Sequence, residues 1–408
     1  MNDRALAEAL DRFATPFYLF DESELSATIE HLQAPLPQNV SLCYAMKANP
    51  FIVSEAARRV ARVEVCSPGE MRICQETGVP ADQIVVSGVH KDESLMRELV
   101  QSPQPMCRFT VESKSQFDLL ERLAREEGKS LALIIRLTSG NQFGVDASML
   151  RSLARRALDS ELLELKGIQY FPGTQRTSEK HLRRELKRLD AFIAKLREEF
   201  GELPADFELE FGPGLPVEYF ERDEQTARAK DDAQLAVLAS ALREMQFCGP
   251  VILEMGRAIA ALCGTYATKV VDVKRNKGQN YAIVDGGMHQ LVYFGHAMSL
   301  QQPVCTLLPV REGEAETSPW NIYGSLCTTN DALAKQIPLR ELQLDDVLVF
   351  HTTGAYSMTE GISLFLSRDL PRVVLRDERG VLHELRDRVE TYPLNMSGHL
   401  YKDLIHRM

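Results

Sequence analysis

The strongest constraint on the fold is a repeated order of segments between residues 38 and 256, where short β-rich runs alternate with amphipathic helical runs. The expected strands are 40–46, 62–67, 83–87, 107–111, 131–137, 165–171, 207–211 and 251–254. Apolar residues at helical spacing predict helices over 54–60, 68–76, 113–125, 147–158, 179–200 and 233–245. About eight β-then-α units with nearly continuous apolar strands predict an α/β fold, a closed parallel (β/α)8 barrel. A doubly wound open sheet is the alternative, but no G-x-G-x-x-G follows the first strand.

The pattern changes after residue 256, where helical periodicity becomes scarce. Two β-like runs, 265–274 and 281–284, predict a hairpin, and further strand-like runs are 304–308, 347–350, 372–375 and 388–392. Near the start, 16–20 is strand-like, and Asp21 or Ser23 could cap a helix over 24–32. This opening segment could belong to either domain. We assign residues 28–256 to the barrel, and 1–27 with 257–408 to a mostly β domain.

Composition excludes several classes of protein. The 408 residues carry a net charge of −11, from 47 Lys and Arg against 58 Asp and Glu, which disfavours nucleic acid as the main partner. No run approaches the roughly 18 apolar residues of a membrane span, and the N-terminus lacks the apolar core of a signal peptide. The eight cysteines form no C-x-x-C pair, so we expect free thiols in a cytoplasmic protein without a metal site.

In a parallel barrel the chemistry gathers at the C-terminal ends of the strands. Lys47 closes the first strand, where an apolar setting makes a lysine costly. Burial disfavours the charged form of a lysine, and the neutral amine attacks aldehydes. A lysine that simply emerges into solvent is the alternative, and Lys47 alone favours that interpretation.

Other strand ends carry weaker signals. Gly212-Pro213-Gly214 could let backbone N–H groups approach a phosphate, or could form a simple turn. Glu254 and Arg257 could be an ordinary ion pair. By default Cys327 would be a buried core cysteine and Tyr356 a strand aromatic. Each structural interpretation is favoured singly, so only the order of the whole set carries information.

That order resembles a known family. Tyr44-Ala45-Met46-Lys47-Ala48-Asn49, Glu254-x-Gly256-Arg257, Gly324-x-x-Cys327 and Gly354-Ala355-Tyr356 are similar to motifs of the fold type III pyridoxal-phosphate decarboxylases. This group contains diaminopimelate, ornithine and arginine decarboxylases and shares its barrel with alanine racemase. The resemblance extends over 15–21, 67–70, 111–113, 285–288 and 365–371, which is nearly the whole chain.

The resemblance implies a cytoplasmic homodimer that uses pyridoxal 5'-phosphate to decarboxylate an amino acid at its α-carbon. Lys47 would form the Schiff base with the cofactor, Glu254 would pair with the pyridine nitrogen, and Cys327 would return a proton to the α-carbon. In relatives the cysteine comes from the partner subunit. The remaining implied cofactor residues are Glu64, Phe171, Thr174, Gly212, Gly214, Gly256, Arg257 and Tyr356, and the implied substrate residues are Arg136, Thr328 and Asp331.

Several positions depart from the family pattern. Phe171 stands where relatives carry a stacking histidine, and Thr328 where they carry an acidic residue that contacts a distal amine, although Asp331 is retained. Because these changes touch the substrate more than the cofactor anchors, we expect the cofactor to be kept and the substrate not to be a simple diamino acid. The chain resembles the branch that serves natural-product and siderophore pathways, some members of which act on carrier-protein-bound amino acids.

Two other functions are compatible with the same motifs. A racemase on this barrel would present a tyrosine where the chain has Cys327, and a regulator related to decarboxylases would have lost the cofactor. A basic segment around Arg176, Arg183, Arg184, Lys187 and Arg188 could receive an acidic carrier protein. A solvated helix face is the alternative for that segment.

Overall fold

The computed structural model describes residues 3–103, 106, 108–293, 301–311 and 316–398. The chain forms two compact units. The barrel unit comprises Thr28–Val217 and Arg228–Ile259, and the sheet unit comprises Met1–Ala27, Glu218–Ala227 and Ala260–Met408.

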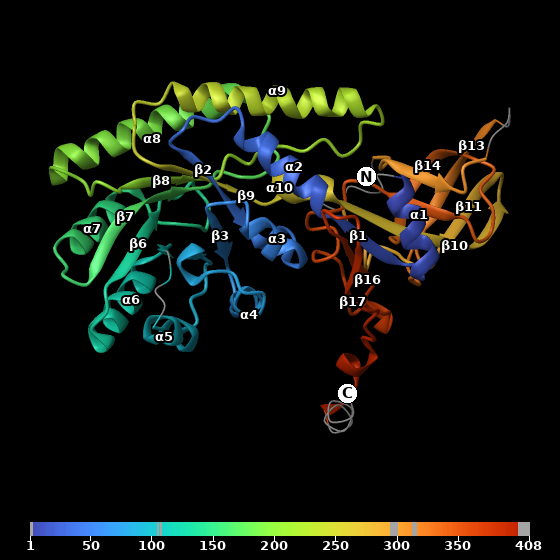
Figure 1. Ribbon diagram of the computed structural model, residues 1–408, viewed down its shortest axis with the longest axis horizontal. Coiled ribbons are helices and arrows are strands. Elements are labelled where there is room, and N and C mark those ends of the chain that lie inside the picture. Colours follow the sequence, from blue (N-terminus) through green and yellow to red (C-terminus); the bar gives the residue numbers. More distant parts are fainter. Residues whose placement is uncertain (1–2, 104–105, 107, 294–300, 312–315, 399–408) are drawn as a thin grey trace. The chain divides into compact units, whose positions relative to one another are not determined.

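Eight parallel strands close into the predicted barrel, because each strand pairs with the next and β9 pairs with β2 (Figure 1). The strands are β2 (Val40–Ala45), β3 (Arg62–Val65), β4 (Ile84–Val86), β5 (Arg108–Val111), β6 (Leu131–Arg136), β7 (Leu163–Tyr170), β8 (Glu208–Phe211) and β9 (Val251–Met255). Expected and observed bounds differ by at most two residues at either end. Cys107, the first residue of one expected strand, lies outside the described residues.

Helices follow the strands, each with an apolar face. They are α2 (Glu22–Gln33), α3 (Val53–Ala57), α4 (Pro68–Glu76), α5 (Glu93–Gln101), α6 (Lys114–Glu127), α7 (Ala147–Leu158), α8 (Glu179–Phe200), α9 (Glu224–Arg243) and α10 (Arg257–Ala260). The bounds expected for α4, α7 and α8 are confirmed. Helix α9 begins nine residues earlier than expected, because its first turns are polar and lack an apolar stripe. Helix α5 was not expected; Asp92 caps it by accepting a hydrogen bond from the Leu95 N–H at 2.9 Å.

The barrel interior holds ionic groups in addition to the usual apolar layers. Successive side chains of a strand alternate between its two faces, so Glu208 and Glu210 of β8 share one face. Glu208 accepts two hydrogen bonds from Arg62 of β3, at 2.5 and 2.6 Å, and Arg108 of β5 lies 3.4 Å away. This pairing neutralises the buried charge near the strand starts and leaves Glu210 one layer closer to the strand ends.

The sheet unit is mostly β, as expected. Its strands are β1 (Phe17–Asp21), β10 (Gly264–Asn276), β11 (Gln279–Val284), β12 (Cys305–Leu308), β13 (Thr317–Tyr323), β14 (Ala332–Arg340), β15 (Val347–Phe350), β16 (Arg372–Arg376) and β17 (Leu382–Arg386), preceded by α1 (Asp3–Arg12). The opening strand β1 pairs with β10 and β16, which places it in this sheet. The expected hairpin is confirmed as β10 and β11, with Lys277 and Gly278 at positive φ in the turn.

In the sheet unit, one expected strand is absent and three observed strands were not expected. The strand expected at 388–392 is absent, and only a bridge between Leu370 and Val389 forms there. Strands β13, β14 and β17 were not expected. β13 and β14 each contain a proline, which argues against a ladder strand. The two prolines, Pro319 and Pro338, lie opposite each other in the β13–β14 pair, and the pairing of the two strands continues on both sides of them.

Residues 218–227 belong to the sheet unit, whereas we expected them in the barrel. Their aromatic side chains explain the difference: the rings of Tyr219 and Phe220 lie 5.7 and 6.1 Å from the ring of Tyr293. The barrel unit also continues to Ile259, three residues beyond the expected boundary.

Candidate active site

Lys47 occupies a tight turn directly after β2. The turn is a single 3-10 turn over Met46–Ala48, and the Tyr44 hydroxyl donates a hydrogen bond to the Asn49 carbonyl at 2.8 Å. This bond ties the end of the strand to the end of the turn and projects Lys47 from it. The Lys47 side chain is 39% exposed, so its amine is only partly buried.

Two carboxylates converge on the Lys47 amine. Its Nζ lies 2.6 Å from Glu64 Oε2 and 3.3 Å from Glu254 Oε1, and both carboxylates are buried. The barrel topology produces this convergence, because β2 lies between β3 and β9, with Ala45 opposite Glu64 and Cys43 opposite Glu254. The predicted roles of Lys47, Glu64 and Glu254 therefore concern residues that are in contact.

The two carboxyl groups differ in protonation. Burial raises the pKa of Glu64, but the charge and hydrogen bond of Lys47 outweigh it and lower that pKa below its usual value. For Glu254, burial and then the charge of Glu64 raise the pKa to about 7, although Lys47 opposes the shift. Near neutral pH the site thus combines an ionised carboxylate with a carboxyl group able to gain or lose a proton.

Sequence reasoning missed the two residues beneath Glu254. The Gln169 side-chain amide donates to Glu254 Oε2 at 3.2 Å and to Glu210 Oε1 at 2.5 Å. Gln169 and Glu210 are fully buried. Burial, followed by the charges of Glu254 and Glu64, raises the pKa of Glu210 to about 8. The available sequence signal was two glutamates, 208 and 210, at alternate positions of an otherwise apolar strand.

Replacing Glu210 with glutamine should change how stability depends on pH. The pKa of Glu210 rises from 4.5 to about 8 on folding, so the folded protein holds a proton that the unfolded chain releases between these values. Wild-type stability should therefore fall as pH rises from about 5 to 9, by roughly 3 to 5 kcal/mol from this group. Glu210→Gln lacks this contribution, so its stability relative to wild type should increase as pH rises.

Urea unfolding of the cofactor-free protein from pH 5 to pH 9 measures the effect. The exposed Glu161→Gln serves as the control and should track wild type throughout. A constant difference between Glu210→Gln and wild type across this range would contradict a protonated Glu210.

Lys91 is another lysine near the strand ends of the barrel, and it was not among the expected site residues. It is buried, and its Nζ donates to the carbonyls of Val86 and Ser87 at 3.3 and 3.2 Å. Burial lowers its pKa to about 8. Because its amine hydrogen-bonds to carbonyls at the end of β4, Lys91 is a less accessible nucleophile than Lys47.

Two glycines form a close-packed backbone site after β8. Gly214 has φ +63°, and a Cβ there would lie 2.0 Å from the Gly173 carbonyl oxygen. A Cβ on Gly212 would lie 2.1 Å from a ring carbon of Phe171. Both positions therefore exclude a side chain. The N–H of Gly214 donates to no group within the described part of the chain, so it can still bind an anion.

The other predicted cofactor residues of the barrel unit lie at strand ends. Thr174 is exposed in the segment after β7. Gly256, between β9 and α10, and Arg257, the first residue of α10, are buried. Their cofactor contacts stay predictions, as does stacking by Phe171.

Arg136 has a buried acidic partner. Its Nη1 lies 3.1 Å from Glu112 Oε2, and its guanidinium lies 4.7 Å from the ring centre of Phe143 and 6.0 Å from that of Phe171. Glu112 and Phe143 were not among the expected site residues. The ion pair and the rings fix the Arg136 side chain at the end of β6. A contact between Arg136 and substrate stays a prediction.

The sheet unit carries the remaining expected residues. Cys327 is exposed in a loop, so the default interpretation as a core cysteine was wrong. Asp331 is fully buried and accepts hydrogen bonds from the N–H groups of Met288 and Leu326, at 2.6 and 2.7 Å. Asp331 thus shapes the loop that presents Cys327 and the half-buried Thr328. Substrate contacts by Thr328 and Asp331 stay predictions.

Tyr356 lies in the same unit, and its backbone is in the left-handed region at φ +64°. The preceding Gly354 packs tightly, because a Cβ there would lie 1.9 Å from the Ala260 carbonyl oxygen. Close packing therefore explains the glycine of the Gly354-Ala355-Tyr356 motif, independently of the role predicted for Tyr356. Phosphate binding by Tyr356 stays a prediction.

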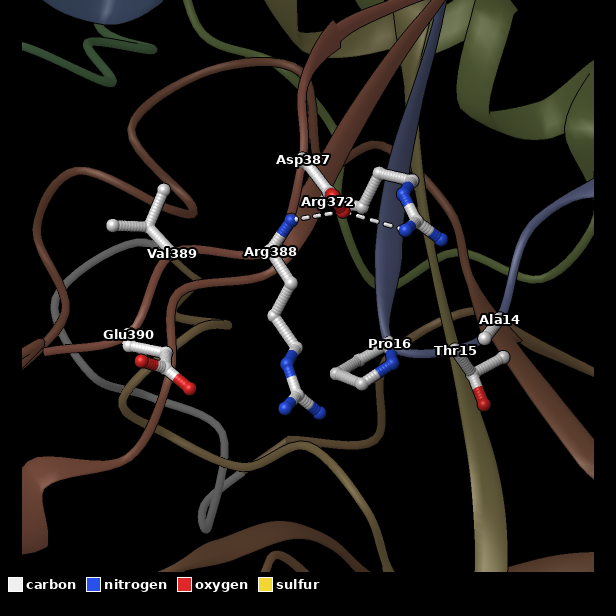
Figure 2. Close-up of a pocket in the computed structure, with 8 residues that line it drawn as sticks. All are labelled: Ala14, Thr15, Pro16, Arg372, Asp387, Arg388, Val389 and Glu390. Atoms are coloured by element: carbon white, nitrogen blue, oxygen red, sulfur yellow. Dashed lines mark hydrogen bonds and ion pairs between the residues drawn. The ribbon is translucent and has the colours of Figure 1, made fainter. Parts of the chain in front are cut away.

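A pocket of about 530 Å³ also lies in the sheet unit (Figure 2). It is lined by Ala14, Thr15, Pro16, Arg372, Asp387, Arg388, Val389 and Glu390. Asp387 Oδ1 lies 2.5 Å from Arg372 Nη2, and Arg388 Nε lies 3.0 Å from Asp369. Because both arginines already have acidic partners, we assign no ligand to this pocket.

A closed parallel barrel with a lysine–carboxylate centre at its strand ends, in a chain that also forms a mostly β unit, has the alanine-racemase-like fold. The family model of "Pyridoxal-dependent decarboxylase, C-terminal sheet domain" matches residues 17–354. The chain belongs to this family of pyridoxal-dependent amino-acid decarboxylases.

Individual relatives agree with the family. The chain is 28% identical over 397 residues to the L-glutamyl-(BtrI acyl-carrier protein) decarboxylase of Niallia circulans, covering 92% of each chain. It is 28% identical over 369 residues to the diaminopimelate decarboxylase of Aquifex aeolicus, covering 86% of this chain and 84% of that one. The crystal structure of Helicobacter pylori diaminopimelate decarboxylase with L-lysine shares the fold, with a TM-score of 0.80, 22% identity and coverage of 98% and 99%.

Within the described residues, no helix has the length and apolar character needed to cross a membrane.

Proposed function

We propose that this protein is a pyridoxal 5'-phosphate-dependent decarboxylase whose substrate is an amino acid joined to a carrier. The observation that supports it most is the contact of Lys47 with Glu64 and Glu254 at the barrel's strand ends, in a chain of this family. The cofactor fits the residues present, because an amine, a buried carboxyl group and a glycine-only backbone site match its aldehyde, ring nitrogen and phosphate.

When bound, the cofactor supplies an electron sink for the pair of electrons left after carbon dioxide departs. Lys47 would hold the cofactor covalently, and Glu254 would keep the ring nitrogen protonated. With its pKa raised to about 7, the Glu254 carboxyl group can hold or release a proton near neutral pH, and it would face the ring nitrogen. The N–H of Gly214 would bind phosphate. Cys327 would donate its thiol proton to the α-carbon.

The substrate proposal depends on what the site lacks. Thr328 stands where relatives that act on basic amino acids carry an acidic residue, and a threonine offers no charge to a distal ammonium. A substrate whose side chain ends in a neutral thioester needs no such partner. The L-glutamyl-(BtrI acyl-carrier protein) decarboxylase of Niallia circulans is similar along almost the whole chain, and its name supplies the kind of substrate proposed here, an amino acid linked to a carrier protein.

We also propose a homodimer. Apolar side chains that are 42–53% exposed gather on two segments of the sheet unit, which a hydrogen bond from Asn395 to the Leu364 carbonyl joins at 2.9 Å. These side chains are Ile362, Leu364, Phe365, Leu366, Tyr392 and Leu394. A second copy of the chain would remove this apolar surface from water. The segment 365–371 also resembles the closing motif of the dimeric relatives.

Racemisation and a regulatory role have less support. An exposed cysteine, rather than a tyrosine, at position 327 favours decarboxylation over racemisation. The intact contacts of Lys47 with two carboxylates favour a working enzyme over a regulator without cofactor.

Release of carbon dioxide tests the function. The panel comprises free diaminopimelate, ornithine, lysine, arginine and glutamate, together with the thioester of pantetheine with the side-chain carboxyl group of L-glutamate, which leaves the α-carboxylate free. We expect a cofactor band near about 420 nm and release only from the thioester. Carbon dioxide release from a free diamino acid would overturn the proposal of a carrier-linked substrate. Racemisation without carbon dioxide release would contradict decarboxylation.

A further inference from the structure

The first half of α8 presents a basic face. Between residues 176 and 188 the chain has six Lys or Arg and two Glu, whereas the protein as a whole carries a net charge of −11. Lys180, Arg184, Lys187 and Arg188 are exposed, and their helical spacing places them on one side. The opposite side is apolar and packs on the barrel through Leu186, Leu189, Ile193 and Leu196.

The local acidic residues do not neutralise this face. Arg183 pairs with two carboxylates, Glu179 at 2.8 Å and Glu244, just after α9, at 2.6 Å. Glu185 pairs with Arg176 at 2.6 Å. Within the described part of the chain, Lys180, Arg184 and Lys187 have no acidic partner. Arg188 lies over the ring of Tyr170 at 5.1 Å. We call Lys180, Arg184, Lys187 and Arg188 the α8 basic face.

A groove runs beside the basic face. It has a volume of about 530 Å³ and lies between α8 and the end of α9. Small side chains, Ala191, Ala194 and Ala241, line it together with Lys187, Asp190 and Glu244. The two carboxylates already have partners, because Asp190 accepts hydrogen bonds from the N–H groups of Gln246 and Phe247, and Glu244 pairs with Arg183. The combination of an exposed basic face and a neighbouring groove lined mainly by small and apolar side chains suits a helix that carries acidic side chains beside a few apolar ones.

The start of α8 is tied to the candidate active site. Arg176, three residues before the helix, donates its backbone N–H to the Gly214 carbonyl at 2.9 Å. The basic face then spans about 12 Å along the helix, from Lys180 to Arg188. The start of α8 therefore lies on the side of the barrel that carries the strand ends, Lys47 and the predicted phosphate site.

We propose that the α8 basic face and the adjoining groove bind an acidic carrier protein that delivers the amino-acid substrate as a thioester. This inference rests on the proposed function and adds the surface that selects the carrier. Because the whole chain is acidic, a local basic face is what permits an acidic partner to approach.

The test separates carrier binding from chemistry. The L-glutamyl BtrI acyl-carrier protein and the L-glutamyl thioester of pantetheine are compared as substrates of the cofactor-loaded protein. We expect wild type to have a KM at least about tenfold lower for the carrier-bound substrate. The triple variant Lys180→Glu, Arg184→Glu, Lys187→Glu should lose this advantage and its salt dependence, while kcat and KM for the pantetheine thioester stay unchanged.

Lys195→Glu, an exposed basic residue at the other end of α8, is the matched control and should behave as wild type. A wild-type protein without preference for the carrier, or a triple variant that keeps it, would overturn the docking surface while leaving decarboxylation intact. A change in oligomeric state of the triple variant would instead assign the face to self-association. If neither thioester is decarboxylated, the proposed substrate class is wrong.

Discussion

Lys47→Ala should lose the absorbance band near about 420 nm and should reduce carbon dioxide release by at least about a thousandfold. Lys47 is the amine that contacts both Glu64 and Glu254, so its removal takes away the covalent attachment point and leaves two buried carboxyl groups without their cation. Spectra and turnover of the purified variant, measured at saturating cofactor, give both readouts.

The control for charge is Lys47→Arg. A guanidinium can remain paired with Glu64 and Glu254 but cannot form the imine, so this variant should fold as wild type and stay inactive. If Lys47→Ala keeps the band while Lys91→Met loses it, the attachment point is Lys91. If both single variants turn over substrate at the wild-type rate, the chain is not a lysine-dependent pyridoxal enzyme.

The barrel could be predicted because most of its strands are nearly continuous apolar runs and are separated by amphipathic helical runs. Lys47 stands out because a lysine closes an apolar strand, but the strand pattern alone favours a lysine that emerges into solvent, and the resemblance indicated its role. Which carboxylates contact it depends on strand order, and the pairing of β2 with β3 and β9 follows only from closure of the barrel. The resemblance, not the strand pattern, indicated Glu64 and Glu254.

The polar layer beneath the site could not be predicted in the same way. Gln169 and Glu210 meet Glu254 inside the barrel, but their sequence separation from it is large and each looks like an ordinary strand polar residue. Asp331 shows the converse limit. Its motif position suggested substrate binding, whereas its two carboxylate oxygens hold backbone N–H groups of two loops. A motif identifies the residue, and only the fold shows which contacts it makes.

The loop that Asp331 organises leaves the Cys327 side chain exposed, as a proton donor to another subunit's site would need to be. Homodimeric relatives supply the cysteine from the partner, so we expect the same division of labour here. Mixing Lys47→Ala with Cys327→Ala subunits tests it. If sites are shared, re-association at equal amounts should restore up to about a quarter of wild-type activity, because half the dimers then contain one intact site. No recovery would place both groups in one subunit.

Cys327→Ala should slow product formation by about 10²- to 10⁴-fold, or divert the proton to a wrong carbon, while leaving the cofactor band intact. The thiol is the proposed proton donor and holds no part of the cofactor, so loss of chemistry without loss of loading distinguishes it from Lys47. Product analysis in deuterated water and cofactor titration give the two readouts. Cys248→Ala, at another exposed cysteine, is the control and should retain full activity. Unchanged rate and product in Cys327→Ala would make Cys327 a structural residue.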